Sequence, residues 1–254
     1  MASIEGRSED SPADFAKQLY GGGPNAELRQ ELWEAVFQYD RALELTPLFD
    51  AFEARAAALY ALGWRGEAIA DYTRALDLRQ DSLVYLERGQ VFLEMNQYGA
   101  AEADFLRALE LDLPDSDLRD AYVGLGDAHR NLGALEAAIS DYSIAIRMDP
   151  DNWSPYYWRG VSLVGLQRFP AALDDFSRVI AQRPLGTSAA YYARGVLNWM
   201  NGQCELARDD LTVFGNLDFD KDLLARAPFY LEYLRGATRC DPPPEDVSIL
   251  IENL

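Results

Sequence analysis

The sequence is poor in histidine, cysteine and positive charge, and each shortage narrows what the protein can do. Among 254 residues there are one histidine and two cysteines. A zinc centre or a histidine-activated nucleophile would need more of these ligands than the chain offers. Two cysteines are also too few for the disulfide framework of a small secreted domain. We therefore expect no metal, no cofactor, no catalytic residues and a reduced, cytoplasmic protein.

Basic residues are outnumbered, 23 Lys and Arg against 42 Asp and Glu, which gives a net charge of -19. Such a charge repels phosphate backbones and anionic membrane surfaces and attracts basic proteins. No run approaches the roughly 20 apolar residues that cross a bilayer. The composition thus excludes nucleic acid as a partner and direct membrane insertion, and it predicts a soluble chain.

A repeat runs through most of the sequence. Alanines recur at intervals of 33, 37, 34 and 35 residues, at Ala68, Ala101, Ala138, Ala172 and Ala207. Twelve residues before each stands a small residue: Ala56, Gly89, Gly126, Gly160 and Gly195. Sixteen residues before each stands an aromatic residue: Phe52, Tyr85, Tyr122, Tyr156 and Tyr191. Four residues after each stands a large apolar residue: Tyr72, Phe105, Tyr142, Phe176 and Leu211.

These columns predict a hairpin of two helices in each repeat. An aromatic residue followed by a small residue four positions later forms one stripe of a helix, and small residues on facing helices let the two approach closely. The turn of each hairpin holds a residue suited to a left-handed helix cap, and these are Gly63, Asn96, Gly133, Gln167 and Gly202. The sequence therefore predicts a fold built from repeated helix hairpins.

Segments 62–78 and 133–142 resemble the tetratricopeptide consensus, and the similarity covers roughly residues 49–216. The resemblance implies an all-α, right-handed superhelical solenoid of antiparallel helix hairpins, with about five full repeats and degenerate caps. It also implies a non-catalytic scaffold for protein–protein interaction. Ile4 to Arg7 resemble a protease site used to remove purification tags, so we exclude the first seven residues from the fold.

The predicted organisation has nine parts. They are a tag or disordered start (1–11), a degenerate N-terminal cap (12–48), five repeats (49–81, 82–116, 117–152, 153–186 and 187–219), a capping helix (220–236) and a Pro-rich tail with a short apolar segment (237–254). The tail either folds back or docks on another subunit.

A polar column predicts ion pairs inside the hairpins. Arg55, Arg88, Arg159 and Arg194 each precede an aspartate by 16 residues, at Asp71, Asp104, Asp175 and Asp210. Positions equidistant from the turn lie side by side in an antiparallel hairpin, so each pair should meet. The third repeat has Leu125 opposite Asp141, and we expect Asp141 to find a neighbour in another repeat or solvent. His129 is interpreted as a spacer in the core.

The exposed face of each first helix predicts a groove for a peptide or protein partner. Its candidate residues are Asp50, Glu53, Tyr60, Leu83, Leu86, Gln90, Glu94, Asp120, Val123, Asp127, Arg130, Asn131, Tyr157, Val161, Tyr192 and Trp199. The first half is acidic with a leucine patch and the second is aromatic and aliphatic, so the expected ligand carries basic and apolar residues. Two interpretations of Tyr157, Tyr192 and Trp199 stay open: they line the groove, or they pack against neighbouring helices.

Some tetratricopeptide domains hold the C-terminal carboxylate of heat-shock chaperones with Lys, Asn and Arg. The matching positions here are Glu53, Ala57, Glu87, Asp120 and Gly124, which cannot hold a carboxylate. An alternative function is a structural protein that forms homo-oligomers through its end caps and tail.

Overall fold

The computed structural model describes residues 26–182 and 188–216, which contain eleven α-helices and no strand. The helices are α2 (Ala26–Leu45), α3 (Phe49–Ala61), α4 (Arg65–Leu78), α5 (Ser82–Glu94), α6 (Tyr98–Glu110), α7 (Asp115–Asn131), α8 (Leu135–Met148), α9 (Trp153–Gly165), α10 (Phe169–Gln182), α11 (Ser188–Met200) and α12 (Cys204–Asn216). The predicted tag, capping helix and tail lie outside these residues. The fold class is the predicted one, an all-α solenoid of helix hairpins.

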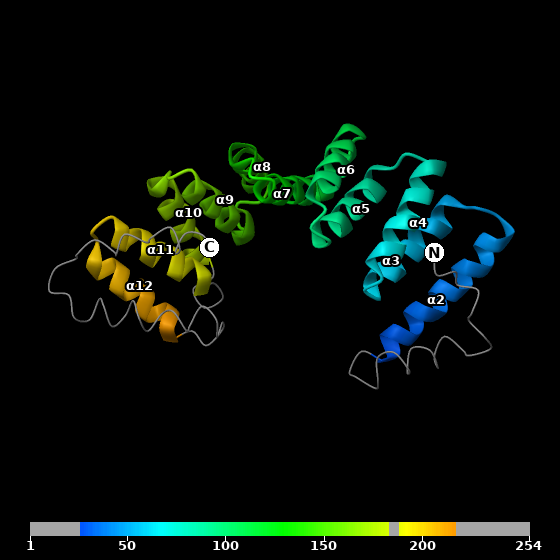
Figure 1. The fold of residues 1–254 in the computed structure, drawn as a ribbon, viewed down its shortest axis with the longest axis horizontal. Helices are drawn as coiled ribbons and strands as arrows, with labels where there is room; N and C mark the ends of the chain where they lie inside the picture. Colours follow the sequence, from blue (N-terminus) through cyan, green and yellow to red (C-terminus); the bar gives the residue numbers. More distant parts are fainter. Residues whose placement is uncertain (1–25, 183–187, 217–254) are drawn as a thin grey trace. The chain divides into compact units, whose positions relative to one another are not determined.

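Consecutive helices pack as antiparallel pairs (Figure 1). The chain forms two compact units, one ending at Gly124 and the other beginning at Leu125. In the first unit the core gathers Trp33 of α2, Tyr72 of α4 and Val84 of α5. In the second, a core around Phe176 joins α9, α10 and α11. Each unit buries apolar residues between neighbouring helices, which is how a repeat array is stabilised.

The turns of the hairpins adopt the predicted left-handed backbone. φ is positive at all five predicted positions, including +58° at Asn96 and +57° at Gln167, where the residue is not glycine. At the first turn, the Trp64 amide donates to the Leu59 carbonyl over 2.8 Å, which closes the helix end. The turns therefore fix where every first helix ends and every second helix begins.

The small column lies against the large apolar column, as predicted. A Cβ atom added to Gly126 would stand 2.7 Å from the ring of Tyr142, and one added to Gly160 would stand 2.9 Å from Phe176. Both rings are fully buried. Glycine is required here because a side chain would overlap the ring of the second helix.

Arginine–aspartate pairs join the two helices of four hairpins, which confirms the predicted register. Arg159, for example, donates from Nε and Nη2 to the two carboxylate oxygens of Asp175 over 2.8 and 2.6 Å. The other three pairs have the same two-bond geometry. They are Arg55–Asp71, Arg88–Asp104 and Arg194–Asp210.

The same arginines also reach the preceding hairpin. Nη1 of Arg88 donates to the Thr73 hydroxyl over 2.9 Å, and Nη1 of Arg159 donates to the Ser143 hydroxyl over 2.9 Å. Arg194 bonds Ser177 in the same way, and Arg55 bonds Asp40 of α2. Each arginine therefore ties its own hairpin together and fastens it to the one before.

One expectation, about Asp141, needs correction. Asp141 does not turn to another repeat or to solvent, because His129 of its own repeat lies 2.7 Å away through Nδ1. His129 stands one helical turn after Leu125 and so reaches the same side of the hairpin. In the fifth repeat, Asn198 donates from Nδ2 to Asp210 over 3.3 Å. His129 and Asn198 each contact the aspartate of their own hairpin.

Cys204 departs from the expected reduced state, since it is disulfide-bonded. Among the described helices none is long and apolar enough to cross a membrane.

Candidate functional site

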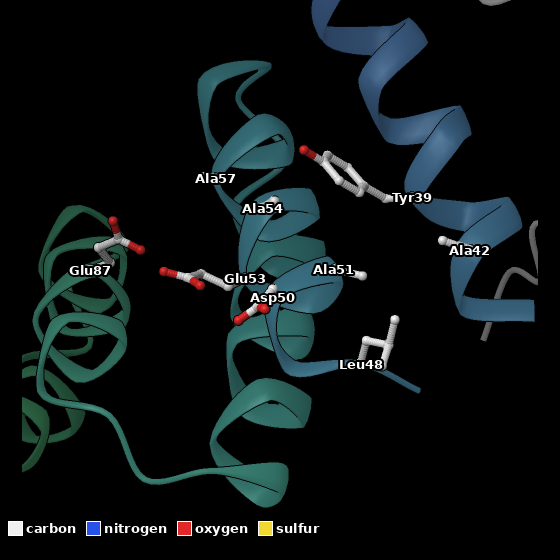
Figure 2. A pocket seen from close by; sticks show the side chains of 9 residues that line it. All are labelled: Tyr39, Ala42, Leu48, Asp50, Ala51, Glu53, Ala54, Ala57 and Glu87. Atoms are coloured by element: carbon white, nitrogen blue, oxygen red, sulfur yellow. The ribbon is translucent and has the colours of Figure 1, made fainter. Parts of the chain in front are cut away.

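A hollow of about 630 Å³ lies over the exposed face of α3 in the first unit. Its walls come from α2, α3, α5 and the residue that precedes α3 (Figure 2). The lining residues are Tyr39, Ala42, Leu48, Asp50, Ala51, Glu53, Ala54, Ala57 and Glu87. Four of them are alanines, whose small side chains leave the space open.

One side of the hollow is apolar. Tyr39 and Ala42 project from α2 toward α3, where Ala51 and Leu48 stand opposite them (Figure 2). Leu48 keeps 50% of its surface exposed. Exposed apolar surface at the edge of a concavity is typical of a binding site. This side can therefore receive an apolar group.

The other side of the hollow is acidic. The carboxylates of Glu53 on α3 and Glu87 on α5 point toward one another (Figure 2). Burial, together with the negative charges of Asp81 and Asp50, raises the pKa of Glu53. Burial also raises the pKa of Glu87, and the charge of Glu53 adds to that rise. Neither glutamate forms an ion pair with any residue that the structure describes.

Glu87 is held in place from below. The buried Tyr72 donates a hydrogen bond to its carboxylate, and this bond works against the rise in the pKa of Glu87. Burial and the charge of Glu87 raise the pKa of Tyr72 well above its usual value, so its hydroxyl remains a donor. Tyr72 thus gives Glu87 a hydrogen-bond donor at the hollow.

Arg79 is the cation that acts on this cluster. Its guanidinium lies 3.7 Å from Asp50 and 3.5 Å from Asp81, and it stacks over the ring of Phe49 at 3.5 Å. Asp81 is further engaged as the cap of α5, where its side chain accepts from the Leu83 amide over 3.1 Å. Arg79 therefore lies beside the carboxylates at the rim of the hollow, and its charge also works against the rise in the pKa of Glu53.

Further along α5, Glu94 is already neutralised. It accepts hydrogen bonds from the Tyr60 hydroxyl and from Arg65 Nε, the latter over 2.8 Å. Although burial raises the pKa of Glu94, these bonds lower it overall. Tyr60 and Glu94, both predicted groove residues, are thus tied to one another across neighbouring repeats.

The remaining predicted groove residues have varied surroundings. In the first unit, Leu83, Gln90 and Asp120 are exposed, and Leu86 and Val123 are partly buried. In the second unit, Val161 is partly buried and Asn131 is exposed.

Two charged groove residues of the second unit have partners. Asp127 accepts a hydrogen bond from Tyr142 over 2.6 Å. Burial raises the pKa of Asp127 in spite of this bond. The Arg130 guanidinium lies over the Trp158 ring at 4.3 Å.

The three aromatic residues proposed for the groove are buried, which is a correction. Tyr157 keeps 9% of its surface, and Tyr192 and Trp199 keep 1% each. Tyr192 packs against Phe214 of α12 with ring centroids 5.2 Å apart, and Tyr157 packs against Phe176 at 5.9 Å. Of the two interpretations, packing against neighbouring helices therefore holds, and the aromatic half of the groove is not an open surface.

Of the nine residues that line the hollow, the predicted groove contains only Asp50 and Glu53. The seven others are Tyr39, Ala42, Leu48, Ala51, Ala54, Ala57 and Glu87. Tyr39, Ala42 and Leu48 belong to the degenerate N-terminal cap, from which no residue was included in the predicted groove. Glu87 follows the column aromatic by two positions, just beyond the face that was searched. Its pairing with Glu53 could have been found by asking which acidic residues neighbouring first helices share.

Comparison with known proteins agrees with this architecture. The family described as tetratricopeptide repeat matches residues 86–153 and 157–212. The chain is a tetratricopeptide repeat protein. In the described part of the chain, no three or more His, Cys, Asp or Glu side chains come together in a group that could hold a metal ion.

Among curated proteins, the mouse (Mus musculus) DnaJ homolog subfamily C member 3 is 33% identical over 91 residues, which are 36% of this chain and 18% of that protein. A tetratricopeptide repeat and J domain-containing co-chaperone, DNJ1 of Cryptococcus neoformans, is 30% identical over 90 residues, 35% of this chain and 17% of that protein. The chain thus matches less than a fifth of the length of these relatives.

Solved structures share the fold. YrrB, a tetratricopeptide repeat protein with an unusual peptide-binding site, has a TM-score of 0.64 at 22% identity over 75% of this chain and 97% of its own. The C-terminal part of a Cytophaga hutchinsonii repeat protein has a TM-score of 0.67 at 18% identity, covering 88% of this chain and 87% of its own.

Proposed function

We propose that the protein is a non-catalytic scaffold that binds a segment of a partner protein on the exposed face of α3 and α5. The segment carries basic and apolar residues. The observation that carries this proposal is the hollow over α3, in which a wall of apolar side chains adjoins two carboxylates, Glu53 and Glu87, that form no ion pair with a described residue. Two neighbouring carboxylates repel one another, and a bound cation between them would offset both this repulsion and the cost of their partial burial.

Charge over the whole chain supports a basic partner. A net charge of -19 draws a basic segment toward the protein and speeds its association at low salt. The hollow then supplies short-range contacts that the general charge cannot supply. The binding of peptides by YrrB, which has the same fold, is consistent with this use of the face.

A chaperone carboxylate does not fit this face. Glu53 and Glu87 occupy positions where a carboxylate ligand would need cations, and their charges would repel it. The partner is therefore expected to differ from the heat-shock chaperone tails that other tetratricopeptide domains bind.

Self-assembly is the second candidate, favoured by exposed apolar side chains on α2 and in the connection from α2 to α3. Phe37, Leu45 and Leu48 keep 45%, 87% and 50% of their surfaces. Static light scattering over a hundredfold range of concentration separates the two functions. A constant monomer mass supports the scaffold, and a mass that grows with concentration supports assembly through the cap.

The compartment also needs a test. The disulfide at Cys204 fits an oxidising compartment better than the cytoplasm expected from the cysteine count. Counting free thiols in denatured protein from its native source decides this, since two free thiols support the cytoplasm and none supports an oxidising compartment.

The scaffold function itself is tested by capture of partners from native lysate on the immobilised full chain. A variant with Glu53→Lys and Glu87→Lys serves as the comparison. The proposal expects a protein that the wild type retains and this variant loses. Equal capture by both would contradict the assigned face.

A further inference from the structure

The hollow over α3 places an apolar and an acidic site on opposite sides of one helix. Figure 2 shows Tyr39 and Leu48 on the side of α2, and Glu53 and Glu87 on the side of α5. The exposed ridge of α3 between them carries Ala54 and Ala57, whose methyl groups leave room for a crossing backbone. A ligand that fills the hollow must therefore cross α3 instead of lying along it.

Each side of the hollow accepts a different chemistry. The acidic side holds two carboxylates on neighbouring helices, one of them oriented by Tyr72, with no ion pair to a described residue. A lysine or arginine side chain is long enough to bring its charged group to both carboxylates while that group stays near solvent. Tyr39, Ala42 and Leu48 offer no charge, so the opposite side favours an aliphatic or aromatic group.

The separation of the two sides sets the spacing in the ligand. Packed helices stand roughly 8–10 Å apart, so sites on either side of one helix are separated by about that distance. In an extended segment, side chains two positions apart point the same way and are about 7 Å apart. A lysine or arginine stem covers the remaining distance.

We propose that the hollow recognises two side chains of an extended partner segment. A lysine or arginine lies between Glu53 and Glu87, and a large apolar residue two positions away lies against Tyr39, Ala42 and Leu48. This rests on the proposed scaffold function and adds the ligand's sequence preference to it. It differs from the groove expected from the sequence, in which apolar ligand residues were assigned to distant repeats.

The test is a selection of random nonapeptides from a display library on the immobilised full chain. Four proteins are compared: wild type, Glu53→Gln with Glu87→Gln, Leu48→Ser, and a control with Glu205→Gln and Asp209→Asn. The control removes the same two charges from exposed positions of α12. General electrostatic attraction is therefore equal in the two charge variants.

Wild type and control are expected to enrich peptides with a basic residue two positions from a large apolar one. The Glu53→Gln, Glu87→Gln variant should lose the basic preference and bind the enriched peptides about tenfold more weakly, since each exposed charge pair contributes up to ~1 kcal/mol. Leu48→Ser should lose the apolar preference and keep the basic one.

The outcomes separate this inference from the function on which it rests. If wild type and the Glu53→Gln, Glu87→Gln variant select the same peptides, the inference is wrong and the scaffold function stands. If basic and apolar residues are enriched without fixed spacing, the crossing geometry is wrong. If no peptide is enriched on wild type, the binding of short segments, and the inference with it, is overturned.

Discussion

His129 Nδ1 lies 2.7 Å from Asp141 Oδ2. This is the third repeat, which has a leucine, Leu125, at the position where the other four repeats have an arginine. The hairpin keeps a polar partner for its buried aspartate by placing it one turn further along α7. The only histidine of the chain therefore contributes to the pairing of the two helices in its hairpin.

Replacing His129 should destabilise the second unit. The His129→Leu variant leaves Asp141, which is 8% exposed, without this partner, and a buried acceptor so deprived costs about 1–3 kcal/mol. Adding Leu125→Arg restores a donor 16 residues before Asp141, the spacing of the four observed pairs, and should recover most of the loss. Urea unfolding measures both effects. A neutral His129→Leu variant would contradict the assigned role.

Glycine positions in the hairpins should respond in opposite directions. Gly126→Ala places a methyl group 2.7 Å from Tyr142, whose hydroxyl is bonded to Asp127, so the ring cannot easily yield. Overpacking should outweigh the gain in helix propensity and cost about 1–2 kcal/mol. Gly99→Ala on exposed α6, where nothing lies within 4 Å, should stabilise by about 0.5–1 kcal/mol. Thermal unfolding that ranks the two the other way would refute the packing argument.

The buried aromatic residues should act on stability and not on binding. Tyr192→Ala and Trp199→Ala each remove a side chain that is 1% exposed and should cost about 3–5 kcal/mol. Thermal unfolding of each variant, with peptide affinity measured well below its melting temperature, separates the two effects. Full stability with lost affinity would return these residues to the binding surface.

The acidic pair should link pH to both binding and stability. The pKa values of Glu53 and Glu87 are raised, so both become protonated at a higher pH than ordinary glutamates. Affinity for a basic peptide should therefore fall as pH is lowered from 7 toward 5. A raised folded-state pKa favours folding at low pH, and that contribution is lost as pH rises through the raised value.

The raised pKa values also predict how removing the two charges changes stability. Glu53→Gln with Glu87→Gln should unfold at a higher temperature than wild type at pH 7, and the difference should shrink as pH falls toward 5. Differential scanning calorimetry at both values measures it. A variant less stable than wild type at pH 7 would show that the two charges stabilise the fold instead of opposing it.

The repeated parts of the fold were predictable from the sequence because they recur. Gln167 and Asn96 were identified as turn residues by position alone, and both adopt the left-handed backbone. The arginine–aspartate register followed from distances to those turns. Asp141 was mispredicted because one substitution, Leu125, broke the column, and the replacement lies at a different position of the same helix.

The candidate site was less predictable. The helical periodicity shows which residues lie outside the face buried within a hairpin, but not which of them the next repeat covers. For that reason the sequence could not decide whether Tyr192 and Trp199 line the groove or pack against neighbouring helices. Tyr39 and Leu48 belong to the degenerate cap, and their place in the same hollow as Glu53 depends on how α2 packs on α3. Such contacts between unlike elements need the three-dimensional structure.

The central claim is that a basic partner segment binds in the hollow over α3, and one affinity comparison tests it most directly. The partner captured from native lysate is titrated by calorimetry into wild type, into Glu53→Lys with Glu87→Lys, and into a control with Glu205→Lys and Asp209→Lys on α12. The account predicts at least a tenfold loss of affinity for the first variant and a change of less than about threefold for the control. Equal losses in the two variants would show that only the overall negative charge matters, and would contradict the assigned site.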